Sequence, residues 1–320
     1  MSRRFEMIDA NGCSIRAAVE GEGPLVLMVH GWPESWYSWR HQMGPIAAAG
    51  YTAAAMDVRG YGGSSKPHEI EAYTMETIVG DVQAVADKLG GGKAILIGHD
   101  WGAPIVWNSA LSDPGRFKAV AGLSLPFMGR GRKPFIDIAR ELFTDRGLFF
   151  YQIYYQDEGV VEAEVEADMH TALRKIYYSI SGDAEPGSWP VDKKHGSPLL
   201  EGLTDPDPFP AWLTREDIDY LVAEFEGSGF RGPINRYRNH RRDFEWQEQF
   251  EGVTIDQPAL FITGDRDMGT KMMGRDVESR MRQHVTDLRG YHVLEGCGHW
   301  TQQERPAEVT ALLLDWLKGI

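Results

Sequence analysis

An aspartate at position 100 has the surroundings of a catalytic nucleophile. The apolar run 95–97 leads into Gly-His-Asp-Trp-Gly at residues 98–102, and a segment with helical apolar spacing, 103–111, follows. Strand, sharp turn and helix in this order predict a nucleophile elbow, in which the central side chain is exposed on a strained turn. The flanking glycines suit the close approach of backbone and helix there. The best-known elbow carries serine, so Asp100 predicts a carboxylate nucleophile instead.

Two further residues complete a possible set of nucleophile, acid and base. Asp267 follows a predicted strand at 258–263, and His299 follows another near 291–294. Such sheets bind ligands at the carboxyl ends of their strands, and the order nucleophile, acid, histidine is that of α/β-hydrolases. Each residue alone is equally well explained as a capping aspartate or a surface histidine. Asp265, two residues before Asp267, is a rival for the acid.

Two backbone N–H groups are candidates for an oxyanion hole. His-Gly-Trp-Pro-Glu at residues 30–34 follows the apolar run 24–29, where these folds place one donor. The amides of Trp32 and Trp101 could converge on one oxygen, because Trp101 begins the predicted helix after the elbow. The alternative interpretation is a plain connection between strand and helix.

Glu34 and His99 flank the predicted site in the sequence. A carboxylate and an imidazole can hold a water molecule between them, so the pair is predicted to position water. A local structural hydrogen bond explains the same two residues about as well.

The elements that must position these residues alternate between strands and helices. This alternation predicts a doubly wound, mostly parallel α/β sheet that begins with a hairpin. Strands are predicted at residues 5–9, 14–19, 24–29, 52–56 and 119–125, and helices at 36–49, 75–89 and 306–318.

The alternation is interrupted in the middle of the chain. A helical, aromatic and irregular block replaces it, and residues 182–210 within that block are dense in glycine, proline and aspartate. That segment predicts a long surface excursion. The strand pattern resumes near residue 258. We therefore predict an α/β core domain from residues 1–127 and 247–320, with an inserted helical cap at 128–246.

The charge and the apolar content of the chain exclude some classes of binding partner and indicate a location. The chain has 33 basic and 47 acidic residues and a net charge of −14, which argues against nucleic acid or an anionic membrane as a partner. No apolar run approaches the roughly 20 residues of a membrane span. Residues 1–12 lack the apolar part of a signal peptide, and Cys13 and Cys297 do not suggest a disulfide framework. These features predict a cytoplasmic location with no membrane span.

Four motifs together resemble the epoxide hydrolases of the α/β-hydrolase fold, the soluble type. They are His-Gly-Trp-Pro-Glu at 30–34, Asp-x-Arg-Gly-Tyr-Gly at 57–62, Gly-His-Asp-Trp-Gly at 98–102 and Gly-His-Trp-Thr-Gln at 298–302. The likeness covers nearly the whole chain, and the inserted block resembles that family's helical cap. It also favours Asp267 over Asp265 as the acid.

The resemblance assigns roles to two tyrosines of the cap. Residues 150–156 and 229–238 match the segments that carry the family's two acidic tyrosines. Tyr151 and Tyr237 are by this match the donors to the epoxide oxygen. Tyr154 and Tyr155 are competitors in a stretch where most aromatic residues are expected in the core.

The activity implied is the opening of a small apolar epoxide to a vicinal diol. Asp100 would form an alkyl ester, and water activated by His299 and Asp267 would hydrolyse it. No cofactor and no metal are expected, since neither a metal-ligand spacing nor a phosphate-binding loop is present.

Two alternatives remain open. A haloalkane dehalogenase would use the same Asp100, His299 and Asp267, and a ligand-binding member of the fold would not need them. Tyr151 and Tyr237 favour the epoxide, since a dehalogenase has less use for a phenol as a donor. A homodimer is a further possibility. The natural epoxide and its stereochemistry are beyond the reach of the sequence.

Overall fold

One mixed sheet forms the centre of the molecule. The computed structural model describes residues 3–320, and its strands lie in the order β1-β2-β4-β3-β5-β6-β7-β8. β2 pairs antiparallel with both β1 and β4, and all other neighbours are parallel. The predicted doubly wound, mostly parallel sheet is confirmed. Its strands are β1 (Arg4–Ala10), β2 (Cys13–Glu20), β3 (Leu25–Val29), β4 (Thr52–Met56), β5 (Ala94–His99), β6 (Phe117–Leu123), β7 (Ala259–Gly264) and β8 (Leu288–Leu294).

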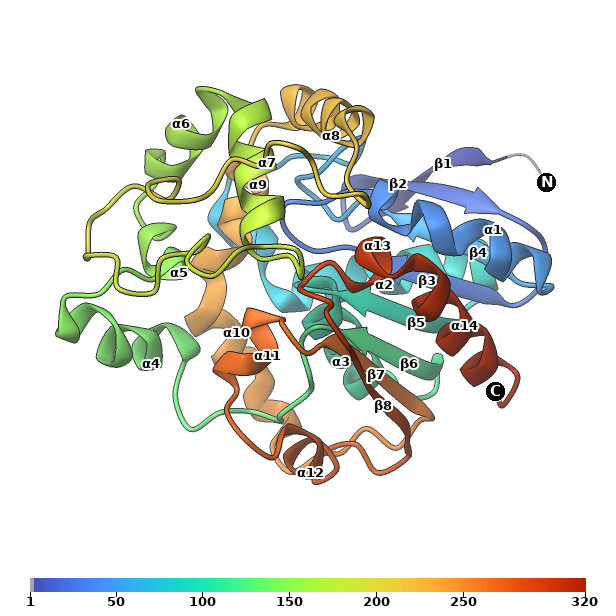
Figure 1. Cartoon of the computed structure of the whole chain (residues 1–320). Helices are drawn as coiled ribbons and strands as arrows, with labels where there is room; N and C mark the ends of the chain where they lie inside the picture. Colours follow the sequence, from blue (N-terminus) through green and yellow to red (C-terminus); the bar gives the residue numbers. More distant parts are fainter. Residues whose placement is uncertain (1–2) are drawn as a thin grey trace.

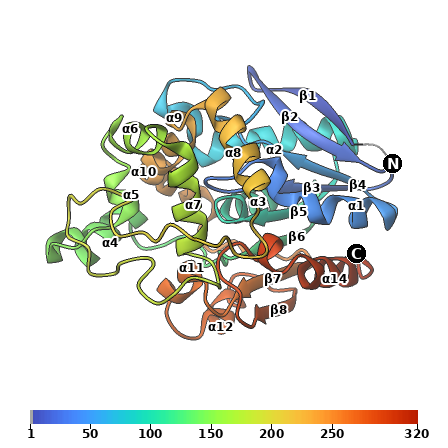
Figure 2. The same ribbon diagram turned by 45° about the horizontal axis from the view of Figure 1, so that its top comes forward.

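Helices cover both faces of this sheet (Figures 1 and 2). α1 packs with α14 in one apolar cluster, while α2 packs with α3 in the other. Every residue of β3, β4, β5 and β7 is buried as a result, which explains their continuous apolar sequences. These helices are α1 (Arg40–Ala48), α2 (Met75–Gly90), α3 (Gly102–Ser112) and α14 (Pro306–Leu317).

Local chemistry explains where several elements begin and end. The Thr74 side chain accepts the N–H of Thr77 and caps the start of α2. Gly91, with a left-handed φ of 56°, caps its end. β6 ends two residues earlier than predicted, because Ser124 has a left-handed φ of 70°. The predicted helix at 36–49 is divided into a 3₁₀ turn, Trp36–Trp39, followed by α1.

The stretch between β6 and β7 is helical and lies to one side of the sheet (Figure 1). Tyr177, on α7, donates its hydroxyl to the carbonyl of Pro33, and its ring stacks on Trp300 at 4.2 Å. The stretch therefore contacts the core beside both predicted catalytic loops. Its helices are α4 (Phe135–Leu142), α5 (Tyr151–Tyr154), α6 (Val160–Glu166), α7 (Met169–Ser179), α8 (Arg215–Ser228), α9 (Arg231–Asn235) and α10 (His240–Trp246).

The predicted surface excursion at 182–210 has no helix or strand, but it does not lie wholly on the surface. Leu199 and Leu203 are buried. The carboxylate of Glu164 explains part of this, because it accepts the backbone N–H groups of Leu199 and Leu200 and draws the segment against α6.

Short helices and turns complete the chain. The helices are α11 (Met268–Met272), α12 (Val277–Met281) and α13 (Thr301–Glu304), and the 3₁₀ turns are η1 (Trp36–Trp39), η2 (Ile70–Tyr73), η3 (Thr144–Arg146), η4 (Arg236–Asn239) and η5 (Gln247–Phe250). Within residues 3–320, none of the helices combines the length and the apolar character that a bilayer crossing requires.

Candidate active site

Asp100 lies on a strained turn between β5 and α3. Its φ is +50°, in the left-handed region that non-glycine residues seldom adopt. A Cβ on Gly98 would lie 2.2 Å from the carbonyl oxygen of Gly102, and one on Gly102 would lie 2.0 Å from that of Val29. Only glycine fits at either position, so the turn has the close packing that the sequence predicted for a nucleophile elbow.

The three predicted residues of the nucleophile, acid and base set meet at the carboxyl ends of the strands. His299 Nε2 lies 3.3 Å from Asp100 Oδ2, and His299 Nδ1 lies 3.2 Å from Asp267 Oδ1. Asp267 is fully buried and also accepts the N–H of Gly269 at 2.8 Å. Asp265, the rival acid, is exposed. The geometry therefore favours Asp267 as the partner of the histidine.

The two carboxylates determine the charge of the imidazole. Burial disfavours the protonated ring, but Asp267 and Asp100 outweigh burial and hold the pKa of His299 well above its usual value. Burial would raise the pKa of Asp267, yet the neighbouring imidazolium lowers it overall. The two carboxylates therefore favour the protonated form of the His299 ring.

One predicted oxyanion donor is already in contact with the predicted nucleophile. The N–H of Trp32 donates to Asp100 Oδ1 at 2.8 Å. A Cβ on Gly31 would lie 2.3 Å from the same oxygen, so glycine is required for this approach. Trp101 follows Asp100 directly as the N-cap of α3, where backbone N–H groups are free of intrahelical partners.

Glu34 and His99 meet directly, without the intervening water that the sequence predicted. His99 Nδ1 lies 2.8 Å from Glu34 Oε2, and both side chains are fully buried. His99 Nε2 lies 2.8 Å from the carbonyl oxygen of His299, and the Gly31 N–H donates to Glu34 at 2.7 Å. This is the structural hydrogen bond that the sequence left as the alternative. It connects the two loops that carry Trp32 and His299.

Tyr151 and Tyr237 lie together above the elbow, although they are far apart in the chain. Their ring centroids are 6.0 Å apart. The ring of Tyr237 also packs edge-on against Trp101 at 5.2 Å and Trp32 at 6.2 Å. Burial, with the Asp100 carboxylate nearby, raises the pKa of both phenols above the usual value. Both phenols therefore remain protonated at neutral pH and can donate hydrogen bonds.

The competing tyrosines differ in their surroundings. The Tyr154 hydroxyl donates to Glu164 at 2.7 Å and is occupied there. Tyr155 is fully buried with its ring 4.9 Å from that of Tyr237, and its hydroxyl has no hydrogen-bond partner in the described residues. Only Tyr155 therefore remains near the pair as an alternative.

Comparison with known proteins identifies the family. A model of the alpha/beta hydrolase fold matches residues 24–182. Epoxide hydrolase A of Mycobacterium tuberculosis is 39% identical over 98% of this chain and 97% of its own length, and epoxide hydrolase B of the same organism is 36% identical over 100% and 99%. The chain belongs to the epoxide hydrolases of the α/β-hydrolase fold.

Solved structures of epoxide hydrolases agree with this assignment. One from an endophytic Streptomyces is 44% identical, with a TM-score of 0.94 over 99% of this chain and 96% of that one. Epoxide hydrolase A from Mycobacterium thermoresistibile is 39% identical, with a TM-score of 0.93 over 99% of both chains. The fold of this epoxide hydrolase is therefore that of its relatives along almost its whole length.

Two residues that the sequence did not single out contact the site. The Ser124 hydroxyl donates to the carbonyl of His299 at 2.8 Å, and the Gln152 side-chain N–H donates to the Tyr151 hydroxyl oxygen at 2.7 Å. Gln152 directly follows Tyr151, which is the only signal that could have found it. Nothing in the sequence indicates Ser124, because its role depends on the approach of a distant loop.

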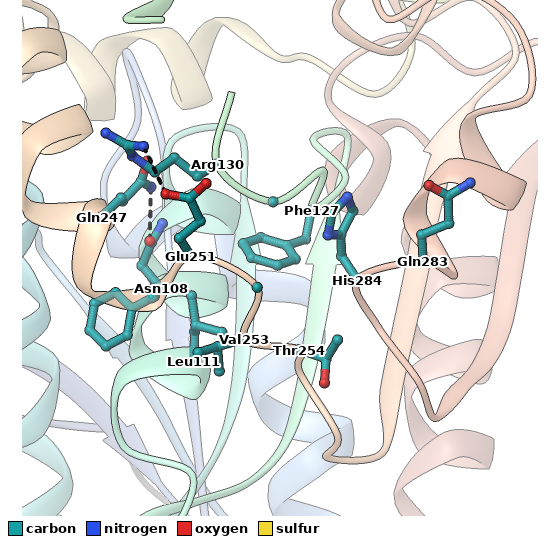
Figure 3. A pocket seen from close by; sticks show the side chains of 13 residues that line it. Asn108, Leu111, Phe127, Arg130, Gln247, Glu251, Val253, Thr254, Gln283 and His284 are labelled. Atoms are coloured by element: carbon teal, nitrogen blue, oxygen red, sulfur yellow. Dashed lines mark hydrogen bonds and ion pairs between the residues drawn. The ribbon is translucent and has the colours of Figure 1, made fainter. Parts of the chain in front are cut away.

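A cavity of about 220 Å³ lies away from these residues, where the chain passes between sheet and inserted stretch (Figure 3). Residues 250–254 line it, together with Phe127, Gly129, Arg130, Asn108 from α3 and His284 after α12. None of the predicted catalytic residues lines this cavity, so it belongs to the junction. Across residues 3–320, no three His, Cys, Asp or Glu side chains are grouped so as to hold a metal ion.

Proposed function

We propose that this epoxide hydrolase opens small apolar epoxides to vicinal diols through an ester on Asp100. The observation that carries the proposal is the position of Asp100: it lies 3.3 Å from His299, and the paired rings of Tyr151 and Tyr237 pack above its turn. A carboxylate, an imidazole and two phenols therefore lie close together at the carboxyl ends of the strands. The names of the relatives support the same substrate class.

Ring opening needs a nucleophile for sp³ carbon and a donor for the departing oxygen. The Asp100 carboxylate attacks one epoxide carbon, and no base is required because the group is already charged. The carbon–oxygen bond of the ring breaks and an alkoxide develops. Tyr151 and Tyr237 donate hydrogen bonds to this oxygen, and a phenol supplies its proton. The product of this step is a hydroxyalkyl ester on Asp100.

Ester formation prepares the second step by changing the charge of the site. Alkylation neutralises Asp100, which removes one of the two carboxylates that hold the pKa of His299 high. The ring can then give its proton to the phenolate left by ring opening and, oriented by Asp267, take a proton from water. That water attacks the ester carbonyl, and the amides of Trp32 and Trp101 stabilise the oxyanion. The diol leaves and the carboxylate is restored.

A haloalkane dehalogenase would use the same three residues with a different leaving group. The pair of phenols favours the epoxide, because a departing halide needs no proton. A panel of aryl, aliphatic and fatty epoxides beside haloalkanes, scored by diol and halide release, separates the two activities. It also separates both from a protein that only binds its ligand.

The origin of the diol oxygen tests the two-step mechanism. With excess enzyme, substoichiometric epoxide and ¹⁸O water, the first turnover should give mostly unlabelled diol and a labelled Asp100 peptide, because water attacks the ester carbonyl. Asp100→Ala should form no diol while remaining folded by circular dichroism. Labelled diol in the first turnover with an unlabelled peptide, or turnover by Asp100→Ala, would remove the nucleophile.

A further inference from the structure

The two phenols of the site differ in one hydrogen bond. The side-chain N–H of Gln152 donates to the hydroxyl oxygen of Tyr151 at 2.7 Å, and Gln152 is 9% exposed. Within residues 3–320 no side chain donates to the hydroxyl of Tyr237 in the same way. Because the Tyr151 oxygen accepts this bond, its own proton remains free to be donated elsewhere.

A second glutamine, four residues later, provides a contrast. Gln156 Nε2 donates to the carbonyl of Gln152 at 2.7 Å and to the carbonyl of Tyr237 at 2.9 Å. This amide joins the α5 segment to η4 (Arg236–Asn239) through backbone atoms only. Gln156 therefore holds the two tyrosine segments together, while only the Gln152 side chain reaches a phenol.

We propose that Gln152 is a positioning residue that makes Tyr151, and not Tyr237, the phenol that gives its proton to the epoxide oxygen. The proposal rests on the proposed function. As the proton leaves, negative charge develops on the Tyr151 oxygen, and an N–H already directed at that oxygen stabilises it without rearrangement. Tyr237 lacks such a donor and acts as a hydrogen-bond donor to the same epoxide oxygen.

The proton balance of this scheme closes over one turnover. In the first step the Asp100 carboxylate forms the new carbon–oxygen bond, the ring bond breaks, and the Tyr151 proton passes to the epoxide oxygen. The negative charge thus moves from Asp100 to the Tyr151 phenolate. In the second step His299 gives its proton to the Tyr151 phenolate and then takes a proton from the attacking water. The tetrahedral intermediate breaks down to the diol, whose new hydroxyl takes the remaining proton of that water, so Asp100 is again a carboxylate and His299 is again protonated.

The surroundings of Tyr151 support a need for this bond. Burial and the nearby Asp100 carboxylate raise the pKa of the phenol, and the Gln152 N–H opposes that rise. A phenol in this place without the amide would be a weaker proton donor. The opposite orientation of the Gln152 amide predicts the opposite result. Its oxygen would then accept the hydroxyl proton of Tyr151 and keep it from the substrate, so replacing Gln152 would speed ring opening.

The test is the rate of ester formation in single turnovers, measured by rapid quench and mass spectrometry. Gln152→Met should slow ester formation about tenfold, the factor carried by an ordinary hydrogen bond, and leave ester hydrolysis unchanged. The unchanged second step shows on the same sample that the variant is folded. A rate of ester formation equal to or above that of the unmodified enzyme would overturn the proposal.

Double variants separate an effect through Tyr151 from a general loss of structure. Gln152→Met should slow the Tyr237→Phe enzyme by its full factor, but should add nothing in Tyr151→Phe, which has no hydroxyl for the amide to contact. The matched variant Gln156→Met contacts no phenol, so its effect should persist in Tyr151→Phe. An equal loss from Gln152→Met in both tyrosine backgrounds would sink the proposal.

Gln152→Glu adds a pH signature that a structural role would not give. The neutral carboxyl group can donate to Tyr151, whereas the carboxylate can only accept, so ester formation should fall as pH rises through the titration of the new group. A rate independent of this titration contradicts the proposal. Tyr151→Phe and Tyr237→Phe enzymes that both open epoxides at the original rate would instead defeat the proposed function, which distinguishes the two failures.

Discussion

The two halves of the candidate site are held in place by different means. Asp100, His299 and Asp267 lie in loops at the strand ends, and hydrogen bonds from backbone groups fix their surroundings, including those of Trp32 to Asp100 and of Gly269 to Asp267. Tyr151 and Tyr237 lie in α5 and η4, which are short helical segments outside the sheet. Aromatic rings pack around them, and in the described part of the chain, residues 3–320, Tyr151 but not Tyr237 receives a side-chain hydrogen bond at its hydroxyl.

The two halves of the site should therefore lose activity differently when one of their residues is replaced. A backbone amide cannot rotate away from its partner, so the half on the sheet has one geometry and should fail sharply when a member is lost. Ring packing is less directional than hydrogen bonding, and two phenols share one task. Loss within the tyrosine pair should therefore be graded.

Among changes that leave the nucleophile in place, the largest effect is expected for His299→Gln, in the half on the sheet. Asp100 needs no base to be alkylated, so the variant should react once and then retain the substrate as an ester, with turnover reduced by about 10²–10⁴-fold or more. Mass spectrometry of the denatured enzyme should show the added substrate mass on the peptide that contains Asp100. Continued diol release without this adduct would mean that another group is the hydrolytic base.

A graded loss is expected for the tyrosine pair. Tyr151→Phe and Tyr237→Phe should each slow ring opening, and the double variant should lose nearly all of it, up to about 10⁴-fold. Each single loss should be smaller than the joint loss because the remaining phenol still donates a hydrogen bond, and Tyr151→Phe should lose more than Tyr237→Phe because Tyr151 is the proposed proton donor. Rapid-quench measurement of ester formation gives all three rates. If the double variant keeps the original rate, Tyr155 is the next phenol to replace.

The smallest effect on activity is expected for Glu34→Gln, which changes the support of the sheet half without touching its reacting groups. Glu34 accepts from His99 and from the Gly31 amide, so the neutral variant should lower the free energy of unfolding by about 1–3 kcal/mol. Chemical denaturation at neutral pH measures this loss. A variant as stable as the original would show that the pair is not structural.

The pH dependence of the free energy of unfolding provides a control for the Glu34→Gln prediction. Burial would raise the pKa of Glu34, but His99 outweighs it and lowers the pKa from 4.5 to about 2 in the folded protein. A depressed carboxyl pKa gives stability that is present above 4.5 and is lost as pH falls toward about 2. This part of the acid dependence should be absent from Glu34→Gln.

The sequence by itself determined the sheet and the half of the site that the sheet carries. Asp100 could be recognised because an elbow requires a strand, two glycines and a helix within a few residues, all of which are local. Asp267 and His299 could be placed near it because parallel strands bring their carboxyl ends to one edge. The β6 boundary was predicted two residues too late, since the left-handed conformation of Ser124 has no signature in its neighbours.

Only the tertiary structure decided how side chains from distant loops share their hydrogen bonds. Glu34 contacts His99 directly where a bridging water was predicted, and Asp265 is exposed. The Tyr154 hydroxyl donates to Glu164, and the Gln152 amide donates to Tyr151. The contact of Glu34 with His99 joins segments far apart in the chain, whereas the contact of Gln152 with Tyr151 joins neighbours whose side-chain directions are set by packing. Residue type and spacing indicate which groups are able to form hydrogen bonds. The packing of the inserted stretch on the sheet decides which of these hydrogen bonds form.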